Sequence, residues 1–242
     1  TEIYTLSLHD ALPISAAVES NEILFGPGAV MYGSDAIGGV MDFHTLSPVF
    51  SQNGKSTVKG NAFARFSSAN LEKTGHFDFS AGLKKWAFVT SATWTDYDDL
   101  KAGSNGNSYF LRPVYQKTEN GVDVTVENED PKKQVYSGYS QYSLLQKIAF
   151  KPSANAELDY SFYYSGTSDA PRYDRLYLTG EEQNLVNAEW YYGPQQWMMN
   201  RLAAKFRSDK GIFNQFRIVA AHQLYRERDR KSTRLNSSHV SQ

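Results

Sequence analysis

The residues that could most readily do chemistry in this chain form a glycine-rich segment at positions 26–45. It holds five glycines and one proline and runs directly into an apolar ending. Glycine-rich loops can cradle phosphate groups with their backbone N–H groups. Here the glycine spacing does not match a dinucleotide fingerprint, no Gly-Lys-Ser/Thr follows within the segment, and Pro27 lacks a backbone N–H. Nucleotide binding is therefore not predicted.

Other catalytic or metal-binding patterns are missing from the sequence. The chain has no cysteine, which excludes disulfides, thiolate metal sites and cysteine nucleophiles. His44, His76 and His222 have no metal-ligand spacing, and His76 falls on the polar side of an alternating segment. Acidic clusters lie in expected loops without a calcium-loop pattern. We therefore predict no enzyme, no catalytic residue, no metal and no cofactor.

The composition favours strands. The 242 residues include 16 Tyr, 14 Phe and 4 Trp, an aromatic share of 14%, and bulky rings pack well on a pleated surface. The formal net charge of -1 gives no basic footprint for nucleic acid, so that partner is excluded. No apolar run reaches the length of about 18 residues that a transmembrane helix needs.

Both ends of the chain resemble sequencing-library adapters translated in frame. The opening residues 5–14 and the closing residues 229–239 carry this resemblance. We therefore interpret residues 1–15 and 229–242 as adapter sequence and exclude them from fold prediction, as for other appended segments. The remaining residues are expected to be an internal fragment of a longer protein.

Alternation of apolar and polar residues predicts seven strands after the glycine-rich segment. The alternation is clearest at 75–83, where Phe77 and Phe79 share one side and His76 and Asp78 the other. A further short buried strand is predicted within 16–25. The seven predicted strands span residues 58–66, 75–83, 86–97, 135–150, 157–165, 198–206 and 216–224.

The predicted connections alternate between short and long. Residues 98–133 and 168–196 form long connections, and both fall at the same end of an up-and-down arrangement. Outer-membrane barrels show this asymmetry, with short periplasmic turns and long extracellular loops. Strands of about ten residues also match a tilted membrane span. We therefore predict an all-β fold, the first part of an antiparallel transmembrane β-barrel.

The glycine-rich segment resembles the end of the plug domain of TonB-dependent outer-membrane receptors. In that family Gly-Pro, Leu/Met-Tyr-Gly and Ile-Gly-Gly-Val stand in this order before the first barrel strand. The resemblance implies a plug ending at 16–48 and the beginning of a barrel at 56–228, with a structural role for the motif residues. These are Gly26, Pro27, Gly28, Tyr32, Gly33, Ile37, Gly38, Gly39 and Val40.

A second local resemblance concerns the long connection at 168–196. Its beginning, Ser168-Asp-Ala-Pro-Arg-Tyr-Asp-Arg175, is similar to an extracellular loop of family members that take up iron complexes or haem. Arginines and aromatic rings suit an anionic or aromatic cargo, although they could equally serve only to order the loop. The candidate ligand residues are Arg172, Tyr173, Arg175, Trp190, Tyr191 and Tyr192.

The resemblance implies a receptor in the bacterial outer membrane. Its partners would be membrane lipid, a small nutrient such as an iron-siderophore or haem complex, and the TonB complex, whose binding box would lie upstream of this chain. Two alternatives stay open. A passive porin would leave residues 26–45 as an unpaired surface loop, and a soluble β-domain that binds glycans or proteins would bury its aromatic stripe in a core.

Overall fold

A computed structural model describes residues 16–26, 31–32, 39–52, 54–180, 184–208 and 213–231. Antiparallel strands dominate this part of the chain, which confirms the predicted all-β class. No helix among these residues has the length and apolar character needed to cross a membrane. The predicted adapter residues 1–15 and 232–242 lie outside the described ranges.

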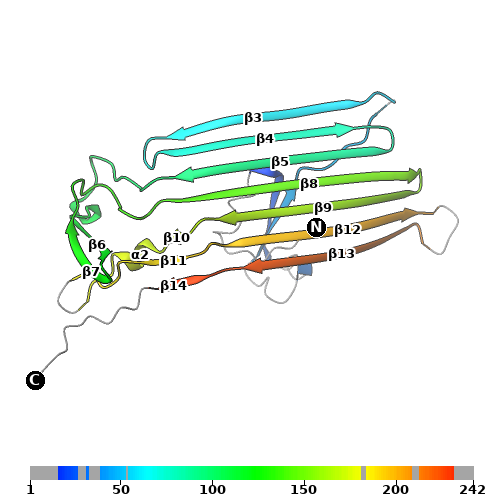
Figure 1. The fold of residues 1–242 in the computed structure, drawn as a ribbon. Helices are drawn as coiled ribbons and strands as arrows, with labels where there is room; N and C mark the ends of the chain where they lie inside the picture. Colours follow the sequence, from blue (N-terminus) through cyan, green and yellow to red (C-terminus); the bar gives the residue numbers. More distant parts are fainter. Residues whose placement is uncertain are drawn as a thin grey trace, which may run out of the picture.

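Seven long strands form one open, antiparallel sheet in which each strand pairs with the next along the chain (Figure 1). They hold 11 to 15 residues each. All seven match predicted strands, whereas the short strands inside the two long connections were not predicted. Their bounds are β3 (Thr57–Ser67), β4 (Glu72–Gly82), β5 (Trp86–Tyr97), β8 (Tyr139–Ser153), β9 (Ala156–Thr167), β12 (Gln196–Arg207) and β13 (Gln215–Arg226).

One predicted strand boundary is wrong. The segment 135–150 was expected to be extended throughout, but β8 begins only at Tyr139. Tyr136 has a φ of 67°, a left-handed conformation that a regular strand does not contain. The side chain of Ser137 also accepts a hydrogen bond from the backbone of Leu100, at 2.8 Å. These residues therefore belong to the preceding connection.

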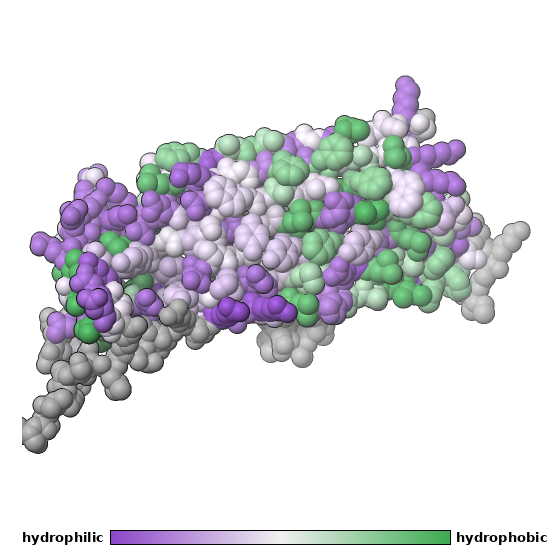
Figure 2. Space-filling view, viewed as in Figure 1, coloured by the Kyte–Doolittle hydropathy of each residue, from purple (hydrophilic) through white to green (hydrophobic). Residues whose placement is uncertain are grey.

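The sheet leaves its apolar face uncovered, whereas soluble sheets bury theirs. Register keeps the apolar side chains in line from strand to strand, as in the pairs Phe77 with Ala92 and Ile148 with Tyr160. Figure 2 shows apolar side chains gathered over this face and hydrophilic ones at the end with the long connections. The large exposed apolar residues of this face include Phe77, Phe79, Trp86, Trp94, Leu144, Leu158, Leu202, Phe216, Ile218 and Leu224.

The opposite face carries mostly polar side chains, with a patch of buried apolar ones on the central strands, and is the covered one. On β4 the side chains of Glu72, Thr74 and His76 are buried, while Phe77 and Phe79, which follow them on the other face, are exposed. This is the reverse of the usual rule that large apolar residues lie inside. We call this surface the polar face.

A hairpin of two short strands lies against the polar face, behind the sheet in Figure 1. It consists of β1 (Val18–Leu24) and β2 (Val40–Thr45), paired antiparallel. The strand predicted within 16–25 is confirmed, but its predicted burial is wrong, because five of the seven β1 residues are exposed. Only Ala17, just before β1, enters the buried cluster.

The short and long connections occupy opposite ends of the sheet, as predicted (Figure 1). At the turn end, β8 and β9 are joined by residues 154–155 alone. At the loop end, residues 98–138 hold β6 (Val114–Glu119) and β7 (Val122–Glu127), which pair with each other. Residues 168–195 hold β10 (Ala170–Pro171), α2 (Tyr173–Leu176) and β11 (Trp190–Tyr192). The backbone of β14 (Asp229–Lys231) pairs with β11, although residues 229–231 were assigned to the adapter.

A substitution at Gly82 tests how closely the linker at residues 46–56, between the hairpin and β3, approaches the sheet. A Cβ at Gly82 would lie 2.3 Å from the carbonyl oxygen of Val49, whereas one at Gly75 in the same strand meets nothing within 4 Å. We expect Gly82→Ala to lower the free energy of unfolding by about 1–3 kcal/mol because the linker must shift. Gly75→Ala serves as the matched control and should be neutral. Urea unfolding followed by tryptophan fluorescence measures both; equal effects would contradict the close approach.

Candidate functional site

The described part of the glycine-rich segment uses glycine where the backbone requires it. Gly26 has a φ of 76° and Gly39 a φ of 139°, both in the region that side chains disfavour. A Cβ at Gly39 would lie 2.8 Å from the carbonyl oxygen of Leu24. Gly39 therefore permits the close approach that lets β2 begin at Val40. Outside the described residues lie Pro27, Gly28, Gly33, Ile37 and Gly38.

Tyr32 contacts the hairpin rather than an open surface. Its hydroxyl donates to Oδ2 of Asp42 at 3.3 Å, and Asp42 is only 3% exposed. His44 lies 3.6 Å from the same carboxylate oxygen. Asp42 thus joins a residue of the glycine-rich segment to β2, and the structural role of Tyr32 stays a prediction.

A small apolar cluster seats the hairpin on the polar face. Its members come from the hairpin and from three central strands, and Tyr163 is 1% exposed. Leu46 packs against the same cluster, and its backbone N–H donates to the carbonyl of Ala17 at 2.8 Å. The buried residues of the cluster are Ala17, Leu145, Tyr163, Trp197 and Met199.

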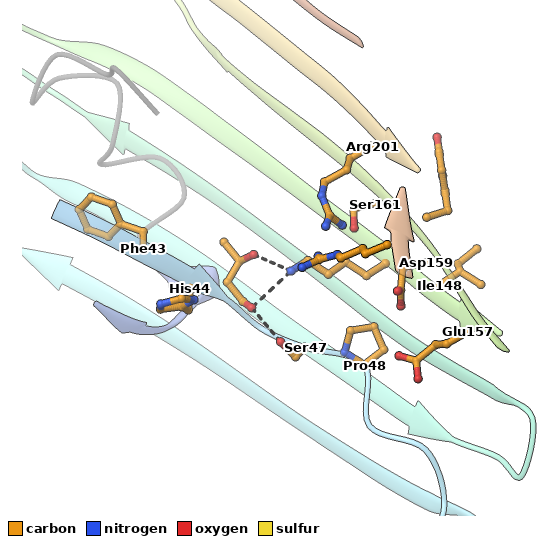
Figure 3. A pocket seen from close by; sticks show the side chains of 13 residues that line it. Phe43, His44, Ser47, Pro48, Ile148, Glu157, Asp159, Ser161 and Arg201 are labelled. Atoms are coloured by element: carbon orange, nitrogen blue, oxygen red, sulfur yellow. Dashed lines mark hydrogen bonds between the residues drawn. The ribbon is translucent and has the colours of Figure 1, made fainter. Parts of the chain in front are cut away.

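A buried lysine fixes the end of β2 to the sheet (Figure 3). Lys147 on β8 is 9% exposed. Its ammonium donates to Oγ1 of Thr45 at 2.6 Å and to the carbonyl of Thr45 at 3.3 Å. The Thr45 hydroxyl also lies 3.4 Å from the hydroxyl of Tyr163. A buried charge is costly unless such partners satisfy it, so these contacts hold hairpin and sheet together.

A polar cavity of about 270 Å³ lies beside this contact, between β2 and the strands. Figure 3 shows Glu157 and Asp159 on β9 and Arg201 on β12 around it. Charges of both signs therefore line the space between hairpin and sheet. Within the described residues no group of three His, Asp or Glu side chains is placed to hold a metal ion.

His76 is part of the wall of the polar face. It is 6% exposed, and its Nδ1 lies 2.8 Å from the hydroxyl of Thr93 and its Nε2 3.3 Å from Asp78. The ring also stacks on Phe63, with centroids 4.9 Å apart. Both ring nitrogens are thus engaged within the sheet, in line with the predicted wall position.

The loop residues proposed to bind a ligand do come together at the loop end. The backbone N–H of Arg172 donates to the carbonyl of Trp190 at 2.8 Å, which ties the start of α2 to β11. The guanidinium of Arg172 lies over the ring of Tyr192, and that of Arg175 over the ring of Trp190, at 5.0 and 5.4 Å. The two arginines therefore order the loop through cation–π contacts.

These residues border a cavity of about 790 Å³ at the junction of loop and strands. Of the six predicted residues, Arg172, Tyr173 and Tyr192 line it, and Arg175, Trp190 and Tyr191 do not. Burial raises the pKa of Tyr173 to about 12, so its phenol stays neutral. Sequence reasoning missed further lining residues. Asp174 and Gln195 lie in the same connection as the predicted ones, whereas strand ends far away in the chain supply Tyr139, Gln141, Tyr225 and Glu227.

The two long connections contact each other. The guanidinium of Arg112, in the first connection, lies 3.9 Å from the ring centroid of Tyr177 in the second. Gln116 on β6 donates its side-chain amide to the carbonyl of Leu185. The two long connections are therefore joined to each other at the loop end of the sheet. The cavity lies where these connections meet the strands.

Comparison with known proteins assigns no family. No protein-family model matches the chain, and no curated protein matches it either.

Lys147→Met tests whether the lysine holds the hairpin in place. Methionine keeps the apolar stem but removes both hydrogen bonds to Thr45, each worth about 1.5–3 kcal/mol when one partner is charged. We expect amide hydrogen exchange in β2 to accelerate at least tenfold, because local opening becomes easier. The control is Lys59→Met, at an exposed position on β3. Unchanged exchange in the Lys147 variant would contradict the anchoring role.

Proposed function

We propose that this chain is part of a TonB-dependent outer-membrane receptor, comprising the end of its plug domain and the first seven strands of its β-barrel. The observation that carries the proposal is the sidedness of the sheet together with the hairpin on its polar face. The family resemblance of residues 26–41 agrees with this arrangement.

The exposed apolar face favours a lipid environment over a soluble β-domain. A soluble domain would bury the aromatic stripe, yet Phe77 and Trp94 are each 50% exposed and Trp86 is 41% exposed. Monomeric soluble proteins rarely expose a contiguous apolar patch larger than a few hundred Å². Transmembrane barrels place apolar residues outward and polar residues inward on every strand, which is the alternation seen here.

Aromatic residues mark both ends of the apolar band. At the turn end Trp86 stacks on Phe150, with centroids 4.2 Å apart. At the loop end Trp94 is paired with Tyr142, whose ring lies 5.7 Å from that of Tyr164. Eight residues of strand span about 26 Å along the strand, which is about 20 Å along the membrane normal at a tilt of about 40°, somewhat less than the apolar band of about 25 Å that aromatic girdles flank in outer-membrane barrels.

The seated hairpin favours a plugged receptor over a passive porin. A porin without a plug would leave residues 26–45 as an unpaired surface loop. Instead β2 pairs with β1, and Lys147 and the apolar cluster hold both against the polar face. A segment anchored on the inner wall before the first long strand is the arrangement that a plug ending requires.

In the proposed receptor the loop end faces the outside and the turn end the periplasm. A scarce nutrient, such as an iron-siderophore or haem complex, would bind among the loops. The TonB complex would then pull on the plug to release the cargo inward, with no chemical bond made or broken. Polar contacts such as those of Lys147 suit this task, because water can replace them when the plug moves.

Lipid exposure can be measured with single-tryptophan variants. The chain has four tryptophans, so three are replaced by Phe in each variant. We expect brominated acyl chains to quench Trp86 and Trp94 strongly, because both face outward. Trp197, which is 8% exposed within the buried cluster, is the internal control and should be quenched weakly. Similar quenching at all three positions would argue against the proposed orientation.

Transport is tested by deleting the gene in its host and growing the strain on defined iron sources. Growth on one ferric chelate should be lost, and excess inorganic iron should restore it. Abolishing the proton gradient should stop uptake of the labelled chelate but leave its surface binding intact. Normal growth of the deletion strain on every siderophore and haem source tested would count against an iron receptor.

A further inference from the structure

The loop-end cavity presents mainly neutral polar groups and aromatic faces. Four tyrosine rings line it, from β8, α2, β11 and β13, together with the side-chain amides of Gln141 and Gln195. Its volume of about 790 Å³ is in the range of small-molecule sites. Phenol and amide groups recognise uncharged hydroxyl, carbonyl and amide groups, and ring faces stack on flat or apolar parts of a ligand. The lining residues with tyrosine rings are Tyr139, Tyr173, Tyr192 and Tyr225.

The one arginine of the lining is already paired. Nε and Nη2 of Arg172 donate to the two carboxylate oxygens of Asp174, both at 2.8 Å. This bidentate geometry is the strong form of an arginine–carboxylate pair. A third donor, Nη1, bonds the hydroxyl of Tyr192 at 2.5 Å. The ion pair also holds the pKa of Asp174 below its usual value, so the carboxylate stays charged.

The other charged group of the lining is a carboxylate with neutral partners. Glu227 accepts hydrogen bonds from Gln195 at 3.0 Å and from the hydroxyl of Tyr225 at 2.8 Å. Arg172, Asp174 and Glu227 therefore give the lining a net charge of -1. Arg175 does not line the cavity and contacts Asp174 as well, at 3.4 Å. Among the described lining residues, an anionic ligand would meet no uncompensated positive charge.

We propose that this cavity binds an uncharged ligand rich in hydroxyl or amide groups, and that Asp174 excludes anions by neutralising Arg172. The inference rests on the proposed function and narrows its cargo to uncharged compounds. Asp174 then determines the specificity for uncharged over anionic ligands. The arginines of the loop sequence, taken alone, would instead suggest an anionic cargo.

Three probes of comparable size distinguish the effect of a ligand's charge on binding from the effect of its chemical class. An uncharged ferric trishydroxamate and a trianionic ferric triscatecholate differ in charge at the same metal, and an uncharged maltohexaose offers hydroxyl groups without iron. Binding of each radiolabelled probe is measured on outer membranes from cells that express the protein from its complete gene. We expect at least one uncharged probe to bind more tightly than the triscatecholate.

Asp174→Asn should change this selectivity in a defined direction. Asparagine keeps a hydrogen-bond acceptor for Arg172 but removes the negative charge, so the guanidinium can attract an anion. We expect affinity for the triscatecholate to rise about tenfold relative to the uncharged probes, as for one gained charge-assisted contact. Asp174→Glu should retain the original preference. Asp169→Asn removes an exposed carboxylate of the same loop that does not line the cavity, and should leave binding unchanged.

Each outcome bears separately on the two proposals. Binding of the trishydroxamate supports both. Binding of maltohexaose alone supports the uncharged site and counts against an iron cargo. Tighter binding of the triscatecholate by the unaltered protein, or an equal change for all probes in Asp174→Asn, overturns the inference and leaves the receptor proposal standing. Failure of all three probes to bind overturns the inference as well.

Discussion

The structure depends on one constraint: in a seven-stranded sheet, large apolar side chains such as Phe77, Trp94 and Leu202 line the uncovered face, while the covered face carries mostly polar side chains beside one small apolar cluster. Backbone pairing fixes this, because a slip of one residue in any strand would move its whole apolar set to the other side. The register is regular across all seven strands except for one shift at the turn between β8 and β9, between Phe150 and Ser153. Within the described residues the large apolar side chains of this face stay exposed, which is the observation behind the proposed lipid contact.

The two-faced character of the sheet also explains how the hairpin of β1 and β2 is held on the polar face. A polar face offers little apolar area, so what lies on it is held mainly by hydrogen bonds and a small cluster around Tyr163. Lys147 satisfies its buried charge with Thr45, and the cavity beside it is lined by charges of both signs. Among the described residues this interface is therefore fixed in position by polar contacts and contains only a small apolar cluster, which would suit the moving plug of the proposed receptor.

Alternation along the strands made most of the fold predictable from the sequence. The alternation of apolar and polar residues along a strand shows which side chains share a face. The seven long strands, and the short and long connections between them, follow from that pattern. The boundary near Tyr136 was missed because a left-handed backbone leaves no trace in hydropathy. The burial of β1 was misjudged because Ile23 and Leu24 look like core residues, whereas Ile23 is 52% exposed.

The candidate site could be predicted only in part, because a linear motif does not reveal which charged side chains pair with each other. The sequence indicated the loop at 168–196 and its arginines, and the structure does bring those residues together. The pairing of Arg172 with Asp174 depends on the turn of α2, which points both side chains the same way. The tyrosines from β8 and β13 reach the cavity only through the register of the sheet. A count of arginines therefore overstates the positive charge that a ligand would meet, and selectivity must be argued from the paired groups.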